Sequence, residues 1–293
     1  MVAHTSKAIN CLVVMLGVLY VVATPIGNLQ DITRRAVDVL SSVQMIAAED
    51  TRRTRVLLDE IGVHGVTLVA LHGHNEDQSA ARVLDALQGG ADVALVSDAG
   101  TPLLSDPGFD LVRRCWERRI QVLPIPGASA LAAVLSVCPV PAGQFYFQGF
   151  LAARDTARRT QLEALLARQE AVLFFEAPHR IERCLMDIKE LDPTRQIMLG
   201  REMTKRHESY LAGTPAELLG ELRQTDSLRG EFVGVIEAGS DGGLALDVRN
   251  AMAVLASELP PSQAAKIGAA LLGVKRRELY DLAIALGGPP SPE

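Results

Sequence analysis

The sequence has few aromatic residues, few cysteines and no excess of positive charge, and each shortage excludes a class of protein. Phe, Trp and Tyr make up 4% of the 293 residues, whereas hydrophobic residues make up 48%. The core is therefore aliphatic, as in parallel sheets covered by helices. The four cysteines, Cys11, Cys115, Cys138 and Cys184, form no Cys-x-x-Cys pair. That spacing argues against a disulfide framework and a zinc cluster, so we expect a reducing, cytoplasmic compartment.

The charge balance and the apolar runs limit the partners of the chain. The net charge is −6, so any contact with a nucleic acid has to come from local basic patches. No apolar stretch reaches the roughly 20 residues of a membrane-spanning helix, and we expect no membrane partner. Lys7 precedes an apolar stretch as in a signal peptide, but the stretch ends in a turn and a helix start, not in a cleavage site. We interpret 1–17 as an irregular leader, with Met1 and Met15 both open as the start.

The first half of the chain alternates short apolar runs with helical periods, which indicates a parallel sheet with helices on both faces. This N-terminal α/β domain spans 18–138. Its predicted strands are 18–23, 43–48, 66–71, 92–97 and 120–125, and its predicted helices are 31–42, 52–61, 76–88, 106–118 and 127–137.

A linker rich in proline, CPVPAG at 138–143, precedes a second α/β domain at 144–240. Closely spaced strands near its end favour antiparallel pairing, hence a mixed sheet. The predicted strands are 144–149, 171–175, 196–200, 208–212 and 231–237, and the helices are 156–168, 179–190 and 215–223. Residues 245–293 form a small helical domain of helix-turn-helix type, with Ser262 as an N-cap and Gly273 at the break. Such helix pairs either contact nucleic acid or merely pack, and the sequence leaves both open.

Loops that follow strands carry the ligand sites of open α/β sheets. The first, ATPIGN at 23–28, has Pro25 where a dinucleotide fingerprint needs glycine, which argues against a nicotinamide or flavin dinucleotide. After the fourth strand comes LVSDAGTPLLSDPGF at 95–109. Asp106 and Pro107 are expected to start a helix there, but capping does not explain the carboxylate, amides and hydroxyl from Asp98 to Thr101.

Polar residues follow strands of the second half as well, in FFEAPHRI at 174–181 and GREMTKRHE at 200–208. An apolar strand that ends in Glu176 and leads into His179 and Arg180 is typical of a cleft wall. No His or Cys spacing matches a metal site, so we expect no metal.

The motifs LYVVATPIGNLQDIT, AAEDTRRTRVLL, HNE, VALVSDAGTPLLSDPGFDLVRRC, PIPGASA, FQGFL, FFEAPHR, REMTKRHE and GEFVGVIE follow one another in this order. Their succession resembles the RsmI family of 16S ribosomal RNA ribose 2′-O-methyltransferases, within the tetrapyrrole methylase superfamily. The resemblance covers 18–240 continuously, and the C-terminal helices are similar to the extra domain of that family. Two positions depart from the family pattern: Ala152–Ala153 replaces a Pro and Lys, and Ala177 replaces a hydroxyl residue.

The resemblance implies a class III methyltransferase of two α/β domains that binds S-adenosylmethionine between them. It also implies a cytoplasmic homodimer that methylates a cytidine ribose in the decoding region of 16S RNA, in the 30S subunit. The cofactor-binding residues implied by position, together with the Asp98 loop, are Pro25, Ile26, Gly27, Asp98, Gly100, Thr101, Leu104, Ser129, Ala130, Phe175, Glu202 and Met203.

Removal of the proton from a ribose hydroxyl requires a base or a hydrogen-bond acceptor. The candidates are Glu49, Asp50, Glu76 and Glu176, with His179 or His207 behind them, and spacing does not choose among them. RNA affinity depends on phosphate contacts. The predicted RNA-binding residues lie in locally basic segments beside these loops: Arg52, Arg53, Arg154, Arg158, Arg159, Arg201, Lys205 and Arg206.

Two other functions remain open at this point. One is a tetrapyrrole or diphthine methyltransferase of the same superfamily, although such relatives usually have a glycine-rich first loop. The other is an RNA-binding assembly factor that retains the cofactor cleft without catalysis.

Overall fold

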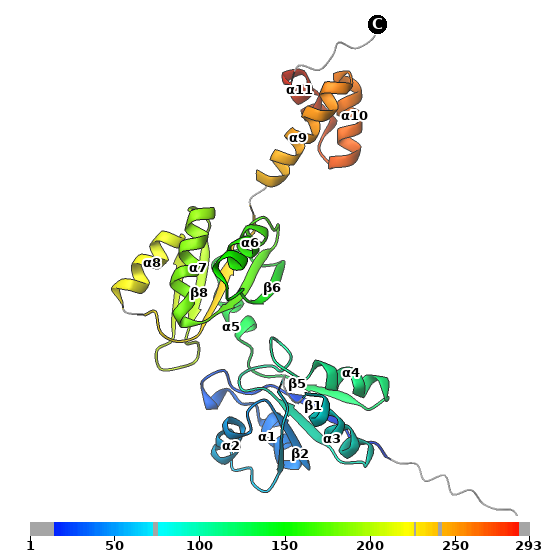
Figure 1. Ribbon diagram of the computed structural model, residues 1–293, viewed down its shortest axis with the longest axis vertical. Coiled ribbons are helices and arrows are strands. Elements are labelled where there is room, and N and C mark those ends of the chain that lie inside the picture. Colours follow the sequence, from blue (N-terminus) through cyan, green and yellow to red (C-terminus); the bar gives the residue numbers. More distant parts are fainter. Residues whose placement is uncertain (1–14, 73–75, 226, 240–241, 287–293) are drawn as a thin grey trace, which may run out of the picture.

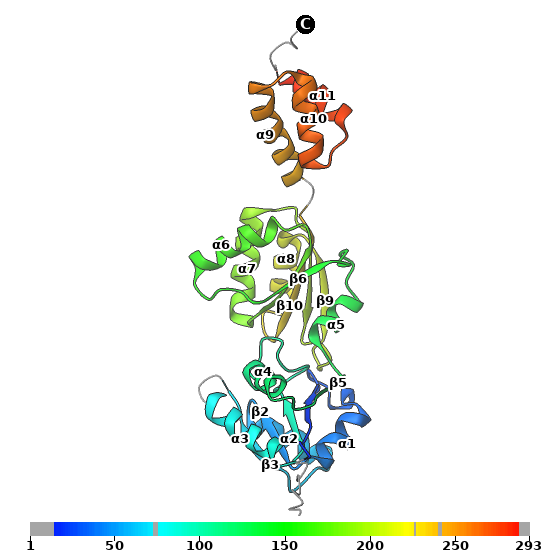
Figure 2. The same ribbon diagram turned by 90° about the vertical axis from the view of Figure 1, so that its right-hand side faces the viewer.

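The computed structural model describes residues 15–72, 76–225, 227–239 and 242–286. Residues 1–14 of the predicted leader 1–17, the residues after Leu286, and His74 and Asn75 of the HNE motif lie outside the described residues. The described chain is elongated. Figures 1 and 2 both place an N-terminal α/β domain, a second α/β domain and a helical unit one after another along the long axis.

The first sheet is parallel throughout, as the alternation of strands and helices predicts. Its order is β3-β2-β4-β1-β5, formed by β1 (Leu19–Val22), β2 (Met45–Ala48), β3 (Thr67–Ala70), β4 (Val93–Val96) and β5 (Val122–Ile125). A short 3-10 turn, η1 (Leu29–Asp31), precedes α1 (Arg34–Ser42), which packs on one face together with α2 (Thr51–Glu60). The other face is covered by α3 (Glu76–Gln88) and α4 (Phe109–Glu117). Both layers are aliphatic, in accord with the scarcity of aromatic residues.

The predicted start of α4 is wrong. The helix begins at Phe109 with Gly108 as its N-cap, at φ +114°, so Asp106 and Pro107 are not its first residues. The Asp-Pro-Gly sequence favours a helix start locally, but Ser105 and Gly108 both have positive φ and delay the helix. Asp106 is left in the loop.

The second sheet is mixed, as predicted, with the order β6-β7-β10-β8-β9. Only β6 and β7 pair in parallel; the other neighbours are antiparallel. The strands are β6 (Phe145–Phe150), β7 (Ala171–Glu176), β8 (Ile197–Arg201), β9 (Ser209–Gly213) and β10 (Phe232–Ile236). One face is covered by α6 (Asp155–Leu166), α7 (Pro178–Leu191) and α8 (Pro215–Gln224).

The other face of the second sheet is covered in part by α5 (Ala130–Ser136). Its buried Val134 clusters with Leu173, Met198 and Val235 of that sheet. The predicted N-terminal domain, 18–138, includes α5, but the packing assigns this helix to the second domain. The chain therefore crosses between the domains after β5, before the proline-rich linker.

The C-terminal unit consists of α9 (Gly242–Glu258), α10 (Pro261–Leu272) and α11 (Arg276–Ala285). Its small core is formed by residues of all three helices: Met252, Ala256, Ala264, Ala265, Leu279 and Ala283. Gly273 ends α10 in the left-handed conformation, as predicted, but Ser262 is not the N-cap, because α10 begins at Pro261 after Pro260. Among the residues that the structure describes, every helix is too short or too polar to cross a bilayer.

Candidate functional site

A cavity of about 380 Å³ lies between the two α/β domains. This volume falls in the range of about 300–1,000 Å³ that is typical of small-molecule sites. Most of the lining is apolar, with a few hydroxyls and carboxylates. The lining residues are Ile26, Ala99, Gly100, Thr101, Leu104, Ser105, Asp106, Ser129, Ala130, Leu131, Phe150, Phe175, Glu176, Ala177, Pro178, Glu231, Phe232 and Val233.

The floor of the cavity is the loop between β4 and α4. Gly100, at φ +83°, exchanges two backbone hydrogen bonds with Thr24, of 2.9 and 3.0 Å. A Cβ atom on Gly100 would lie 3.1 Å from Cγ2 of Ile26. Leu103 and Ser105 also have positive φ, 75° and 76°. A left-handed conformation costs a non-glycine residue about 1–3 kcal/mol and is concentrated at functional sites.

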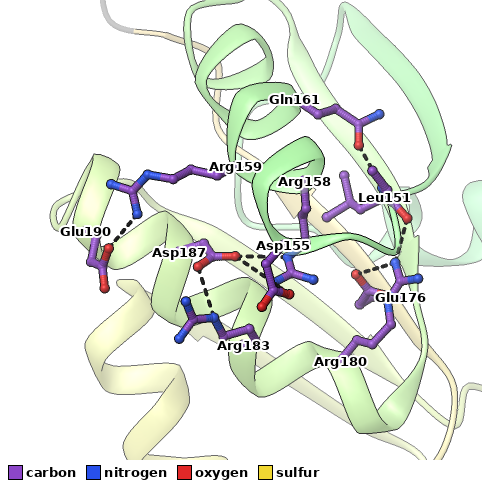
Figure 3. Close-up of polar contacts among 11 residues, drawn as sticks. Leu151, Asp155, Arg158, Arg159, Gln161, Glu176, Arg180, Arg183, Asp187 and Glu190 are labelled. Atoms are coloured by element: carbon purple, nitrogen blue, oxygen red, sulfur yellow. Dashed lines mark hydrogen bonds and ion pairs between the residues drawn. The ribbon is translucent and has the colours of Figure 1, made fainter.

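The opposite wall comes from the ends of β6 and β7. The rings of Phe150 and Phe175 are tilted against each other with centroids 5.5 Å apart. Beside them, the carboxylate of Glu176 is buried and forms an ion pair with Arg180, at 2.7 Å from Nε. Nη2 of Arg180 also donates to the carbonyl of Leu151 at 2.6 Å (Figure 3). Arg180 therefore ties the end of β6 to the end of β7.

Close contacts between the domains fix the two walls relative to each other. The amide of Asn28 donates to Oγ1 of Thr204 at 3.1 Å. A Cβ atom on Gly27 would lie 2.4 Å from Cγ of Lys205, and one on Gly149 would lie 3.1 Å from Oγ of Ser105. The loop after β1 and the bulge in β6 thus approach the other domain closely, and glycine permits this at Gly27 in particular.

The structure divides the predicted cofactor residues into two groups. Those on the cavity wall are Ile26, Gly100, Thr101, Leu104, Ser129, Ala130 and Phe175. The others lie near the cavity without lining it: Pro25, Gly27, Asp98, Glu202 and Met203. Met203 is buried in the core beside Gly200, and Glu202 accepts hydrogen bonds from Lys205 and the amide of Glu231. These two position the second domain's loops.

The four predicted catalytic carboxylates have different surroundings, and of them only Glu176 lines the cavity. Glu49 accepts a hydrogen bond from the amide of Asp98 at 3.2 Å. Asp50 caps α2, and its hydrogen bonds with Arg52 lower the pKa of its carboxyl to about 2. Glu76 accepts from the amide of Gly108 at 3.0 Å. The contacts of Asp50 and Glu76 organise helix starts.

The sequence reasoning missed Asp106, which lines the cavity and is half-buried. Burial raises the pKa of Asp106 to about 6, and the nearby charges of Glu49 and Asp98 act in the same direction, against a hydrogen bond with Ser97. Its position after a strand could have identified it, but the Asp-Pro-Gly pattern was attributed to helix capping alone. Phe150, Glu231 and Phe232 were missed because their place on the wall depends on domain packing.

Arg158 cannot contact RNA in this structure. Its side chain is buried, 1% exposed, and its guanidinium lies 2.9 Å from Asp187 and 2.8 Å from Asp155 (Figure 3). The spacing of the arginines in α6 favoured an exposed basic face, but the side chain of Arg158 points inward against α7. The prediction for Arg158 is therefore wrong.

The other predicted RNA-binding residues are partly or fully exposed. Most have structural partners: Arg52 pairs with Asp50, Arg53 with Asp98, Arg159 with Glu190, and Lys205 with Glu202 and Glu231, while Arg201 donates to the carbonyls of His207 and Arg229. Arg154 and Arg206 are exposed, and no carboxylate of the described residues lies within ion-pair distance of either.

Comparison with known families decides the relationship of the chain. The model of the tetrapyrrole (corrin/porphyrin) methylases matches residues 18–219, and that of the RsmI C-terminal HTH domain matches 242–287. The chain belongs to the RsmI family of tetrapyrrole methylases. Two relatives, from Xylella fastidiosa strain Temecula1 and Escherichia coli O157:H7, are both named ribosomal RNA small subunit methyltransferase I. The chain is 46% and 43% identical to them, over 90% and 93% of this chain and 98% and 96% of theirs.

Solved structures confirm the fold of this RsmI-family chain. A cobalt precorrin-4 methyltransferase superimposes with a TM-score of 0.55 at 13% identity, over 75% of this chain and 94% of the other. A uroporphyrin-III C-methyltransferase from Thermus thermophilus, complexed with S-adenosylhomocysteine, gives 0.51 at 13% identity, over 75% and 97%.

The RsmI family uses S-adenosylmethionine, and the cavity residues fit this group. At Gly100, which has a left-handed conformation, the floor presents backbone without a side chain, while Phe150 and Phe175 offer apolar surface for an adenine. Hydroxyls of Thr101 and Ser129 are available for polar groups, and the lining carboxylates suit a cationic ligand.

Proposed function

We propose that the chain methylates the ribose 2′-hydroxyl of cytidine 1402 in 16S ribosomal RNA, as a cytoplasmic homodimer that acts on the small ribosomal subunit. The observation that supports this most is the similarity to relatives named ribosomal RNA small subunit methyltransferase I, at 46% identity over 90% of the chain. The cavity between the domains and the exposed arginines beside it are consistent with such a reaction.

The cofactor supplies an activated methyl group, and the residues of the chain orient the reactants. Ile26, Gly100, Thr101, Leu104, Ser129, Ala130 and Phe175 would contact the cofactor. Phe150 and Phe175 exclude water from one wall. Alignment of a nucleophile with the transferred group can lower a barrier by several kcal/mol, and here the close contacts between the two domains provide the rigidity.

Of the four candidate residues, Glu176 is the one on the cavity wall, and its side chain is fully buried there. It is held by Arg180 and by the amide of Ala177 at 2.8 Å, so its free lone pairs are fixed in direction. We assign it as a positioning residue that, together with Arg180, holds the end of β7 and with it Phe175 on the cavity wall.

RNA would lie across the exposed basic residues, of which Arg154 and Arg206 have the fewest partners. Arg52, Arg53 and Arg159 reach solvent while they hold their ion pairs. Removal of one cation that binds a phosphate should lower the slope of log affinity against log salt by about 1. We expect Arg154→Glu and Arg206→Glu to weaken RNA binding and reduce this slope. The matched control is Arg249→Glu, at an exposed position of α9.

The function is tested by incubation of the protein with S-adenosylmethionine labelled in the methyl group and either 30S subunits, naked 16S RNA or a tetrapyrrole. Label on one ribose 2′-oxygen of the RNA supports the proposal, and digestion with mass spectrometry identifies the cytidine. Label on the tetrapyrrole contradicts it. No label anywhere, with the cofactor still bound, favours a non-catalytic assembly factor. Sedimentation equilibrium tests the homodimer.

A further inference from the structure

The charges that face the cavity are unbalanced. Three acidic residues line it, Asp106, Glu176 and Glu231, of which Glu176 has a fully buried side chain, and among the described residues its lining includes no Lys, Arg or His. Two of the three form an ion pair: Glu176 with Arg180 at 2.7 Å, and Glu231 with Lys205 at 3.0 Å. Asp106 has no such partner among the described residues.

The surroundings of Asp106 add negative charge instead. Glu49, after β2, and Asp98, after β4, both act on Asp106 as like charges. The nearest compensating cation is Arg53 of α2, which lies 3.1 Å from Asp98 and is mostly in solvent. Ser97 contributes a hydrogen bond but no charge. An ionised Asp106 is thus an uncompensated charge in a largely apolar cavity, which is costly without a cation to neutralise it.

The cofactor and its product differ at one charge. S-Adenosylmethionine has a sulfonium cation, and S-adenosylhomocysteine has a neutral thioether in its place. The amino group, the carboxylate and the adenosine are common to both, so their contributions cancel when the two affinities are compared. The ratio of the two affinities depends on groups that respond to the sulfonium charge or that contact the transferred methyl, and of these two effects only the first depends on the charge of a nearby carboxylate.

We propose that Asp106 is the residue by which this protein distinguishes the sulfonium cofactor from its thioether product. Its carboxylate attracts the cation while the cofactor is intact. After methyl transfer the attraction disappears, the carboxylate is again uncompensated, and the product leaves more readily. The inference concerns the cofactor site alone and holds whichever molecule accepts the methyl group, so its failure and that of the proposed function are distinguishable.

The test is isothermal titration calorimetry of the full-length protein with S-adenosylmethionine and S-adenosylhomocysteine. At about pH 8 we expect Asp106→Asn to weaken binding of the first about fivefold or more, as for charges that interact across a partly buried site. Binding of S-adenosylhomocysteine should change by less than about twofold, because this ligand has no sulfonium charge for the carboxylate to attract. The control is Asp110→Asn, which removes a carboxylate held by Arg113 and Arg114 outside the cavity. Equal losses for both ligands, or none, would overturn the proposal.

A second measurement needs no variant. Because the pKa of Asp106 is raised to about 6, the preference of the unaltered protein for the sulfonium form should decrease as the pH falls from about 8 to about 5. Binding of this ligand near pH 6 should also release protons, seen as a dependence of the binding heat on the buffer. Glu49→Gln removes a like charge and should shift the pH midpoint downward. A preference that is constant with pH in the unaltered protein contradicts the proposal even if Asp106→Asn does not fold.

Discussion

The two walls of the cavity handle buried charge in opposite ways. On the second domain, Glu176 is neutralised by Arg180, and one layer deeper Arg158 lies between Asp187 and Asp155 (Figure 3). On the first domain, Glu49, Asp98 and Asp106 approach one another with only the largely exposed Arg53 nearby.

This difference separates structural charge from charge that is available to a ligand. A buried pair that is complete contributes mainly when it is broken, since the remaining partner is then an uncompensated charge. An incomplete cluster is destabilising by itself and is relieved by a bound cation. We therefore infer that the paired charges of the second domain stabilise the fold, whereas the carboxylates of the first domain contribute to cofactor recognition. The following variants test this difference between the domains.

The largest effect is expected from Asp187→Ala. The buried Arg158 loses its internal partner and keeps only Asp155, whose side chain is exposed. Loss of one partner of a buried pair costs about 3–5 kcal/mol, to be measured as the free energy of unfolding in urea. The control, Glu190→Ala, removes the exposed partner of Arg159 and should cost far less, because solvent screens an exposed ion pair. Equal losses for the two variants would contradict the assignment of the buried Arg158 pair as a structural element of the second domain.

Arg180→Met should have the next largest effect. Glu176 stays buried without its cation, and the carbonyl of Leu151 loses its donor. We expect about 2–3 kcal/mol less stability, because Arg180 is partly exposed, and about tenfold weaker cofactor binding as the Phe150 wall shifts. Arg180→Lys should retain part of the stability and part of the cofactor affinity, because it keeps a positive charge near Glu176. The control is Arg183→Met, three residues along α7, because the half-exposed guanidinium of Arg183 pairs with the buried Asp187 and not with Glu176. A similar loss of cofactor binding there would contradict the role of Arg180 in holding the cavity wall.

Thr101→Trp should weaken cofactor binding at least about tenfold, or about 1.4 kcal/mol, with little change in the free energy of unfolding. The indole would fill the cavity floor, where Oγ1 of Thr101 donates to the carbonyl of Ala128 at 3.1 Å. Calorimetry with S-adenosylmethionine measures the change. Thr160→Trp on the exposed face of α6 is the control for the added ring, and unchanged affinity in Thr101→Trp would place the floor elsewhere.

The smallest effect is a gain in stability from Asp106→Asn. The pKa of Asp106 is raised from 3.8 to about 6 in the folded protein. The folded state therefore binds the proton more strongly than the unfolded chain between these values, and the stability from this group is lost as the pH rises through about 6. At pH above this window the variant should be about 1 kcal/mol more stable, after a discount for partial exposure.

Urea unfolding of both proteins as a function of pH checks this, since the difference between them should vanish below about pH 4. Asp110→Asn provides a contrast of opposite sign, because Arg113 and Arg114 lower the pKa of Asp110 and its removal should destabilise the protein at neutral pH. A difference that does not vary with pH would show that Asp106 is not titrating in the folded state.

Much of the site was predictable because it follows strands. The FFEAPHR motif was interpreted as a cleft wall, and Phe175, Glu176, Ala177 and Pro178 do line the cavity. The loop from Asp98 to Leu104 was singled out because capping did not explain it, and Gly100, Thr101 and Leu104 form the floor. These residues reach the cavity because the ends of parallel strands meet at one sheet edge, and their contact with a cofactor stays a prediction.

The failures have one cause as well. Asp106 was attributed to a helix start that the left-handed Ser105 and Gly108 displace. Arg158 was predicted to bind RNA from an exposed basic segment, although Asp187, which pairs with it in the interior, comes from another helix 29 residues later. Neither the left-handed backbone at Ser105 and Gly108 nor the pairing of Arg158 with Asp187 can be recognised from the local sequence pattern.

The sequence by itself determined the order and type of the strands, the aliphatic core and the membership of the family, since periodicity and motifs are local properties. The tertiary structure alone decided which charges are paired. An ion pair depends on distance between elements that are remote in the chain, and an uncompensated carboxylate such as Asp106 is recognised only when all its neighbours are in place.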